Sequence, residues 1–391
     1  MIDSVAVIGD AGDLHTWSGT PFFFSEAARS VGWPAEPWRL RMAEYGGRRT
    51  LWNLARALTG RGIGGYQYSE AFLGSAEASV PASLWRGRIL SFSQHFPRSR
   101  SAARRGGTVL RYIDATFRSF CGEDGLARGL PARVRQEACS LETDNYRSGE
   151  WVVGMSRWAS ESAVRDCGLD PARAAVILPG ANLEWPQGHA FGGRTAGIDV
   201  GHPLVLGFVG KDWKRKGLPF LIEVRRELGA LGVPAVVRCA GLFPEELRGQ
   251  AGLEYVGFID KSREPLRFID FLVGCDVGCL FSSHEPLGIS TLEFLRAGVP
   301  VAGFTVEGIA DTLPPDAGFR FEPGTSAPEV ALALRDAFDR GAQKARWLRD
   351  NAQQWSPRLT WKRCISEWAQ LLGSGSVRDP VQPWRGLSPP S

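Results

Sequence analysis

The chain has 391 residues, of which 43% are hydrophobic and 23% charged, and its net charge is +4. This length exceeds what one ordinary core needs and predicts two domains. The small basic excess, 46 basic against 42 acidic residues, disfavours a nucleic-acid-binding protein. No apolar run reaches the roughly 18 residues of a membrane-spanning helix.

The seven cysteines are scattered and form no Cys-x-x-Cys motif, which is typical of core thiols in a reducing cytosol. The five histidines lack a metal-binding spacing, so we expect no metal ion. The segment Met1–Gly12 lacks the basic start and long apolar run of a signal peptide. These features favour a cytoplasmic protein.

The first half of the chain alternates apolar runs of strand length with amphipathic segments of helix length. Val5–Gly9 predicts a buried strand, and Phe22–Val31 predicts the helix after it. Further strands are expected over Arg88–Phe92, Val109–Ile113, Trp151–Met155 and Ala175–Leu178, and further helices near Thr50–Leu58, Ala132–Leu141 and Trp158–Cys167. This alternation is typical of a doubly wound parallel α/β sheet.

A second alternation begins after Glu184–Pro203, whose Gly- and Pro-rich composition indicates an interdomain linker. Strands are expected over Pro203–Val209, Ala235–Ala240, Leu253–Phe258, Val277–Phe281 and Val299–Phe304. Helices are expected over Leu218–Leu231, Pro265–Cys275 and Ile289–Ala297, with two more near Pro328–Asn351.

The sequence therefore predicts an α/β protein with two Rossmann-like doubly wound domains, residues 1–185 and 203–356, that face a central cleft. A last helix over residues 357–372 is expected to cross back to the first domain. The Pro-, Gly- and Ser-rich tail, residues 373–391, is expected to be disordered.

The richest cluster of chemically active residues is His284–Glu293, HEPLGISTLE, between a predicted strand and a predicted helix. Gly288 allows a ligand to approach the backbone, and the amides of Gly288, Ile289 and Ser290 are helix N-terminal donors for an anion. Glu285 can accept hydrogen bonds from sugar hydroxyls, and Glu293, about one and a half turns later, from a ribose. The alternative is a proline-containing turn before an ordinary helix.

A second cluster, Gly210–Gly217, has the sequence GKDWKRKG and places four cations within six residues after a predicted strand. Such a loop can neutralise a diphosphate, and fixed positive charge stabilises a departing nucleoside diphosphate most in the transition state. We expect Lys211 and Lys216 to contact phosphate, and Lys214 and Arg215 to face solvent. The alternative is a solvated basic loop.

Together these clusters resemble the retaining GT-B glycosyltransferases of family 4, the group 1 glycosyltransferases. The resemblance rests on Glu285 and Glu293, which have seven residues between them, Gly288 included, and on the Gly-Lys-x-x-x-x-Lys-Gly pattern. Lys211 stands where the family usually has arginine, which keeps the charge but loses a bidentate grip.

The resemblance implies transfer from a UDP-, GDP- or other nucleotide diphosphate-sugar, with retention and without a metal or cofactor. The catalytic residues that the resemblance implies are Glu285, Lys216, Lys211 and Asp114. The nucleotide-sugar-binding residues that it implies are Gly19, Gly210, Lys211, Lys216, Glu285, Leu287, Gly288, Ile289, Ser290 and Glu293.

Several shorter strings support the same resemblance in the order of the chain, namely Trp17–Pro21, Asp114–Phe117, Ser156–Trp158, Pro179–Asn182 and Gly308–Ile309. Many members of the family place a first-domain histidine near the donor sugar. His95, His15 and Asp114 are candidates for a group lining that part of the site, and the sequence does not choose among them.

A basic stretch with Arg98, Arg100, Arg104 and Arg105 either docks on anionic lipid headgroups at the inner membrane face or forms a solvated loop. A GT-B phosphorylase or epimerase and a non-catalytic nucleotide-sugar-binding protein remain alternative functions. A dinucleotide oxidoreductase is disfavoured, because Gly9–Gly12 reads GDAG and not Gly-x-Gly-x-x-Gly. The nucleotide, the sugar and the acceptor stay open.

Overall fold

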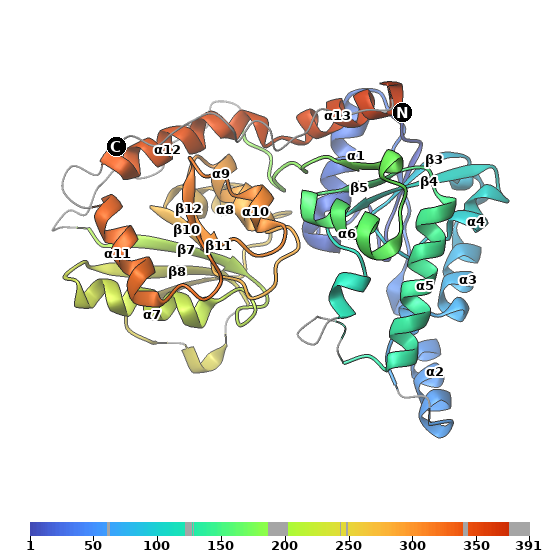
Figure 1. Cartoon of the computed structure of the whole chain (residues 1–391), viewed down its shortest axis with the longest axis horizontal. Coiled ribbons are helices and arrows are strands. Elements are labelled where there is room, and N and C mark those ends of the chain that lie inside the picture. The colour runs from blue at the N-terminus through green and yellow to red at the C-terminus, as the bar shows by residue number, and fades with distance from the viewer. Residues whose placement is uncertain are drawn as a thin grey trace. The chain divides into compact units, whose positions relative to one another are not determined.

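A computed structural model of the chain describes residues 1–60, 63–121, 127, 129–186, 202–242, 244–247, 249–338 and 343–374. Most of the predicted linker and of the predicted disordered tail lies outside these described residues. The chain divides into two compact units (Figure 1). Within the described residues, unit 1 comprises Met1–Leu178 and Cys364–Ser374, and unit 2 comprises Pro179–Arg363.

Unit 1 is built on one parallel sheet whose strand order is β2-β1-β3-β4-β5-β6. The strands are β1 (Ser4–Ala6), β2 (Glu36–Pro37), β3 (Gly87–Ser91), β4 (Gly107–Ile113), β5 (Val152–Gly154) and β6 (Ala174–Val176). The helices are α1 (Thr20–Ser30), α2 (Gly46–Leu58), α3 (Glu70–Ser79), α4 (Ser99–Ala103), α5 (Ala132–Ser148) and α6 (Arg157–Cys167).

Helix α13 (Trp361–Ser374) starts in unit 2 and continues in unit 1. Its Trp368 is fully buried, with its ring centroid 5.3 Å from that of Tyr112 and 6.2 Å from that of Phe24. Phe24 comes from α1 and Tyr112 from the central strand β4, so the last helix helps close the core of unit 1.

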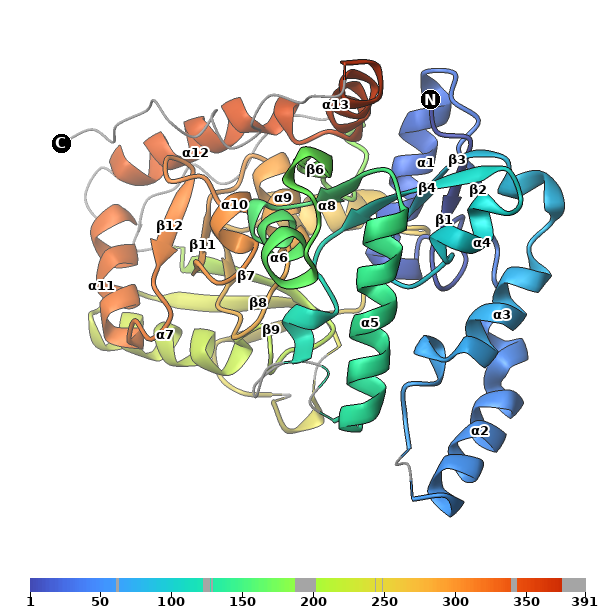
Figure 2. The same cartoon turned by 45° about the vertical axis from the view of Figure 1, so that its right-hand side comes forward.

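Unit 2 has a second parallel sheet, of order β12-β11-β10-β7-β8-β9 (Figure 2). The strands are β7 (Leu204–Gly210), β8 (Ala235–Gly241), β9 (Leu253–Gly257), β10 (Val277–Leu280), β11 (Val301–Phe304) and β12 (Gly318–Phe321). The helices are α7 (Leu218–Ala230), α8 (Pro265–Val273), α9 (Ile289–Arg296), α10 (Ile309–Thr312), α11 (Ala327–Phe338) and α12 (Gln343–Trp355). The chain order reverses between β7 and β10, and this switch point is where open α/β sheets bind ligands.

The two parallel sheets confirm the predicted pair of Rossmann-like domains, and each strand expected from an apolar run is present within a few residues of its predicted bounds. Two strands were missed: β2 has only two residues, and β12 is a four-residue segment, GFRF. Helix α3 was also missed, because its sequence EAFLGSAEAS contains an internal glycine and little amphipathic pattern. Among the described residues, no helix has the length and apolar character to cross a membrane.

Candidate functional site

Two loops of unit 2 meet at the sheet switch point, one after β7 and one after β10. The backbone N–H of Ser283 donates to the carbonyl of Arg215 at 3.0 Å, which ties the loops together. Gly217 caps α7 with a φ of +79°, and a Cβ there would lie 2.1 Å from the carbonyl oxygen of Phe281. Only glycine allows this approach, so the sequence itself brings the basic loop against the end of β10.

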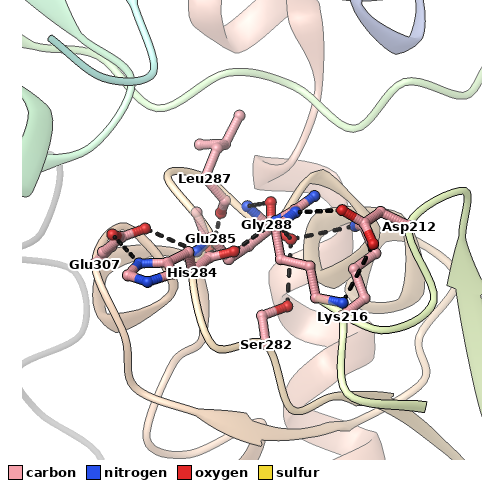
Figure 3. A network of polar contacts seen from close by, with 10 residues as sticks. Asp212, Lys216, Ser282, His284, Glu285, Leu287, Gly288 and Glu307 are labelled. Atoms are coloured by element: carbon pink, nitrogen blue, oxygen red, sulfur yellow. Dashed lines mark hydrogen bonds and ion pairs between the residues drawn. The ribbon is translucent and has the colours of Figure 1, made fainter. Parts of the chain in front are cut away.

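The Glu285 carboxylate is the centre of the polar network at this junction (Figure 3). Its Oε2 lies 3.3 Å from Lys216 Nζ and 3.2 Å from an Arg215 guanidinium nitrogen, and it accepts a hydrogen bond from Ser282 Oγ at 3.3 Å. Its Oε1 accepts from the backbone N–H of Gly288 at 3.3 Å. One buried carboxylate thus gathers two cations, a hydroxyl and the N-terminal cap of α9.

The electrostatics of Glu285 favour its ionised form. Burial raises the pKa of this carboxyl, but the positive charges of Lys216 and Arg215 and the hydrogen bonds outweigh burial, and the net pKa lies below the ordinary glutamate value. Glu285 is therefore a carboxylate at neutral pH, held beside cations that can also bind an anionic ligand.

The cations of the loop after β7 do not separate into site-facing and solvent-facing residues as the sequence predicted. Arg215 was expected to face solvent, and this is wrong: its guanidinium contacts Glu285, Asp212 and the carbonyl of His284, and its side chain is 22% exposed. Lys216 points into the network, whereas Lys211 and Lys214 are exposed beside the rings of Phe258 and Trp213. The inward pair is therefore Arg215 and Lys216.

A third loop, after β11, holds the Glu285 segment from its other side, and sequence reasoning missed its key residue. One Glu307 oxygen accepts the backbone N–H of Glu285 at 2.7 Å, and the other lies 3.1 Å from His284 Nδ1. Glu307 adopts a φ of +46°, a left-handed conformation that is strained for glutamate. At the next residue, Gly308, a Cβ would lie 1.8 Å from the carbonyl oxygen of Pro286. The two loops therefore fit together only with this backbone.

The start of α9 carries the remaining predicted donor-site residues. Leu287 and Ser290 are buried and Ile289 is half-buried, and Figure 3 shows the Leu287 side chain pointing away from the polar network. Glu293 is 1% exposed and pairs with Lys261 from the loop after β9. Burial raises the pKa of Glu293 and Lys261 opposes the rise only in part. Lys261 is a second partner that the sequence reasoning missed.

The first-domain candidates occupy different environments within unit 1. His95 is 1% exposed, its Nε2 lies 3.0 Å from the carbonyl of Ala138, and burial lowers its pKa to about 3. It is a neutral core residue. Asp114 is half-buried directly after β4, and His15 is exposed.

Gly19 caps α1 after two non-glycine residues in left-handed conformation, Trp17 at φ +50° and Ser18 at φ +56°. Such strain is concentrated at functional sites. The segment is therefore a structured turn at the carboxyl side of β1.

The arginines of the predicted lipid-docking stretch are largely engaged with protein groups. Arg98 pairs with Glu77 and Glu70, and its side chain is 17% exposed. Arg105 lies 4.0 Å from the Trp85 ring and donates to the carbonyl of Glu77. Helix α4 over Ser99–Ala103 takes the place of part of the expected loop, and Arg98 is held by carboxylates of the protein. Arg100 and Arg104 are exposed, and lipid contact by this stretch stays a prediction.

The chain is similar in sequence to known proteins. Residues 203–340 match the family model of the glycosyl transferases group 1. A Burkholderia thailandensis protein named "Probable transglycosylase" is 27% identical over 254 residues, 62% of this chain and 60% of its own length. The aligned regions span only 30% to 60% of the first three curated relatives.

Two solved structures share the fold over nearly the whole chain. Sucrose-phosphate synthase from Thermosynechococcus elongatus has a TM-score of 0.64 at 15% identity, covering 96% of this chain and 100% of its own. Anabaena HepE, solved in complex with UDP and glucose, has a TM-score of 0.63 at 15% identity with the same coverage. Residues 203–340 are therefore similar to the group 1 glycosyl transferases, and the chain shares the GT-B fold of these two structures.

Proposed function

We propose that the chain transfers a glycosyl group from a nucleoside diphosphate-sugar to an acceptor, with retention of the anomeric configuration. The observation that carries the proposal is the Glu285 centre: an ionised carboxylate beside Lys216, Arg215 and the N-terminus of α9, at the switch point of the unit 2 sheet. Cations and a helix N-terminus at that position are the elements of an anion site.

The charge arrangement suits the departure of a nucleoside diphosphate. In the proposal, Lys216 binds the diphosphate with Lys211 and the backbone of Gly210 and Gly288, because the leaving group gains negative charge in the transition state. Glu285 holds hydroxyls of the donor sugar. Its cationic neighbours keep it ionised and therefore able only to accept hydrogen bonds.

Farther along α9, Glu293 is proposed to accept from the ribose hydroxyls. Lys261 already occupies one of its oxygens, so the ribose contact uses a carboxylate fixed in place by an ion pair. The protein supplies the required charge through side chains, and the proposal involves no metal. HepE, which shares the fold, was solved with UDP and glucose, and this supports a nucleoside diphosphate-sugar as donor.

The first experiment identifies the donor. The melting temperature of the full chain is measured with UDP, GDP, ADP and TDP, then with sugar conjugates of the nucleotide that stabilises it, since a bound ligand raises stability by mass action. Product configuration is then read by NMR, with and without a chelator. If none of the nucleotides stabilises the chain, the donor assignment is wrong. A product of inverted configuration would contradict the proposed retention, and loss of turnover with the chelator would contradict the proposed metal independence.

The second experiment tests Glu285 itself. Glu285→Gln keeps the shape but removes the charge, and we expect kcat to fall by about 100-fold or more, the scale seen when one preorganised transition-state contact is lost. Glu246→Gln, an exposed substitution in the same unit, is the matched control. Wild-type turnover in Glu285→Gln would contradict the site. Nucleotide binding without turnover in the wild type across a broad acceptor panel would favour a non-catalytic binding protein.

A further inference from the structure

Helix α2 of unit 1 presents its apolar side to solvent. Leu51, Leu54 and Leu58 follow the spacing of one helical face, and they are 68%, 56% and 80% exposed. No residue of this 13-residue helix is buried. Figures 1 and 2 both show α2 projecting from the rest of unit 1 beyond α3. An amphipathic helix normally packs its leucines against the core, so this orientation requires an explanation.

The opposite face of α2 makes the contacts with the protein. The Trp52 ring lies 5.7 Å from that of Tyr66, and within the helix the Arg56 guanidinium lies 4.6 Å from the Trp52 ring. Asn53 Oδ1 accepts the backbone N–H of Gly64 at 3.1 Å. These contacts fix the rotation of the helix, so the leucines face outward because the other face is held.

The sequence around the leucines is strongly basic. Residues 41–64 contain five arginines and one glutamate, a net charge of +4, which equals the net charge of the whole chain. Arg41, Arg48 and Arg49 are exposed. An apolar stripe bordered by exposed arginines is the composition of helices that lie in the interface of anionic membranes.

We propose that α2 is a docking helix for an anionic phospholipid surface, with Leu51, Leu54 and Leu58 inserted among the headgroups and the arginines at the phosphates. A projecting helix suits a planar surface, and the charge of the segment complements anionic lipid. Pairing of the same face with a second copy would bring two segments of charge +4 together, which opposes such a dimer. The inference is independent of the donor site, which lies in unit 2.

The test is cosedimentation of the full chain with vesicles. We expect binding to vesicles of equal parts phosphatidylglycerol and phosphatidylcholine, weaker binding at high salt, and little binding to phosphatidylcholine alone. The variant Leu51→Gln/Leu54→Gln/Leu58→Gln should lower the partition coefficient roughly 100-fold, because three leucines lose most of their burial in the interface. The matched control is Leu266→Gln/Leu332→Gln, which changes exposed leucines of unit 2.

Other occupants of α2 give distinct results. Equal binding by the α2 variant and the control, or no binding of the wild type to the anionic vesicles, overturns the proposal. A concentration-dependent dimer in light scattering also overturns the proposal if the α2 variant abolishes this dimer, because the leucine face would then bind a second copy of the chain. Unchanged circular dichroism and nucleotide-induced melting shift in the α2 variant show that lost binding is not lost folding.

Discussion

Removing the charge of Lys216 tests whether the inward-facing cation of the basic loop binds the donor diphosphate. Lys216→Met keeps much of the apolar stem while removing the ammonium. The Lys216 side chain is 12% exposed, so its charge is only weakly screened by water. A hydrogen bond to a charged group contributes about 1.5–3 kcal/mol, which corresponds to roughly 10- to 150-fold weaker binding of the nucleoside diphosphate.

The same loop supplies the control. Lys214→Met makes the same change in net charge within the same loop. Lys214, however, is exposed, and its ammonium lies 5.0 Å from the Trp213 ring. Isothermal titration calorimetry at two salt concentrations separates a direct contact from a general field, because exposed charges are screened by salt. If the two variants weaken binding equally, or if Lys216→Met binds like the wild type, the assignment of Lys216 is wrong.

Two further substitutions test residues that the structure brought into view. Glu307→Gly should lower kcat at least tenfold while the melting temperature stays within a few degrees. The melting temperature changes little because glycine relieves the strain of the left-handed backbone, about 1 kcal/mol, and this offsets part of the lost hydrogen bonding. An unchanged kcat would exclude a positioning role. His95 provides a test of stability in acid. Burial lowers its pKa to about 3, so the imidazole binds a proton less readily in the folded chain than in the unfolded chain. The free energy of unfolding therefore falls by about 1.4 kcal/mol per pH unit as the pH drops from about 6.5 towards 3. His95→Gln should flatten that slope in urea titrations between about pH 6.5 and 4.5, and an unchanged slope would contradict the buried neutral imidazole.

The sequence predicted the two sheets because every central strand is a short apolar run between polar turns. It also predicted that Glu285, Gly288 and Lys216 lie together, and the structure brings them into one polar network, since each follows a strand that ends at the same edge of the sheet. It failed at Arg215, which lies 70 residues from Glu285 in the chain. Local charge density suggested solvent for Arg215, whereas the close approach permitted by Gly217 turned it inward.

Glu307 shows a second kind of failure. Nothing in the residue types of Val306–Gly308 distinguishes a carboxylate that holds a neighbouring loop from a surface glutamate. Its role comes from a contact 22 residues away, with the backbone of Glu285, and from a backbone conformation that no sequence pattern encodes. Residues whose side chains hold another loop are found only once the loops are placed.

Helix α2 separates what periodicity predicts from what it leaves open. The spacing of Leu51, Leu54 and Leu58 predicts an amphipathic helix, and the helix is present, but a period does not state which face meets the protein. Trp52 decides it here, because its ring packs on Tyr66 and fixes the leucines outward. A single exposed leucine such as Leu266 on α8 needs no explanation, since apolar atoms form much of any protein surface. Three on one face of a projecting basic helix form a group, and this grouping is the basis of the proposed docking surface.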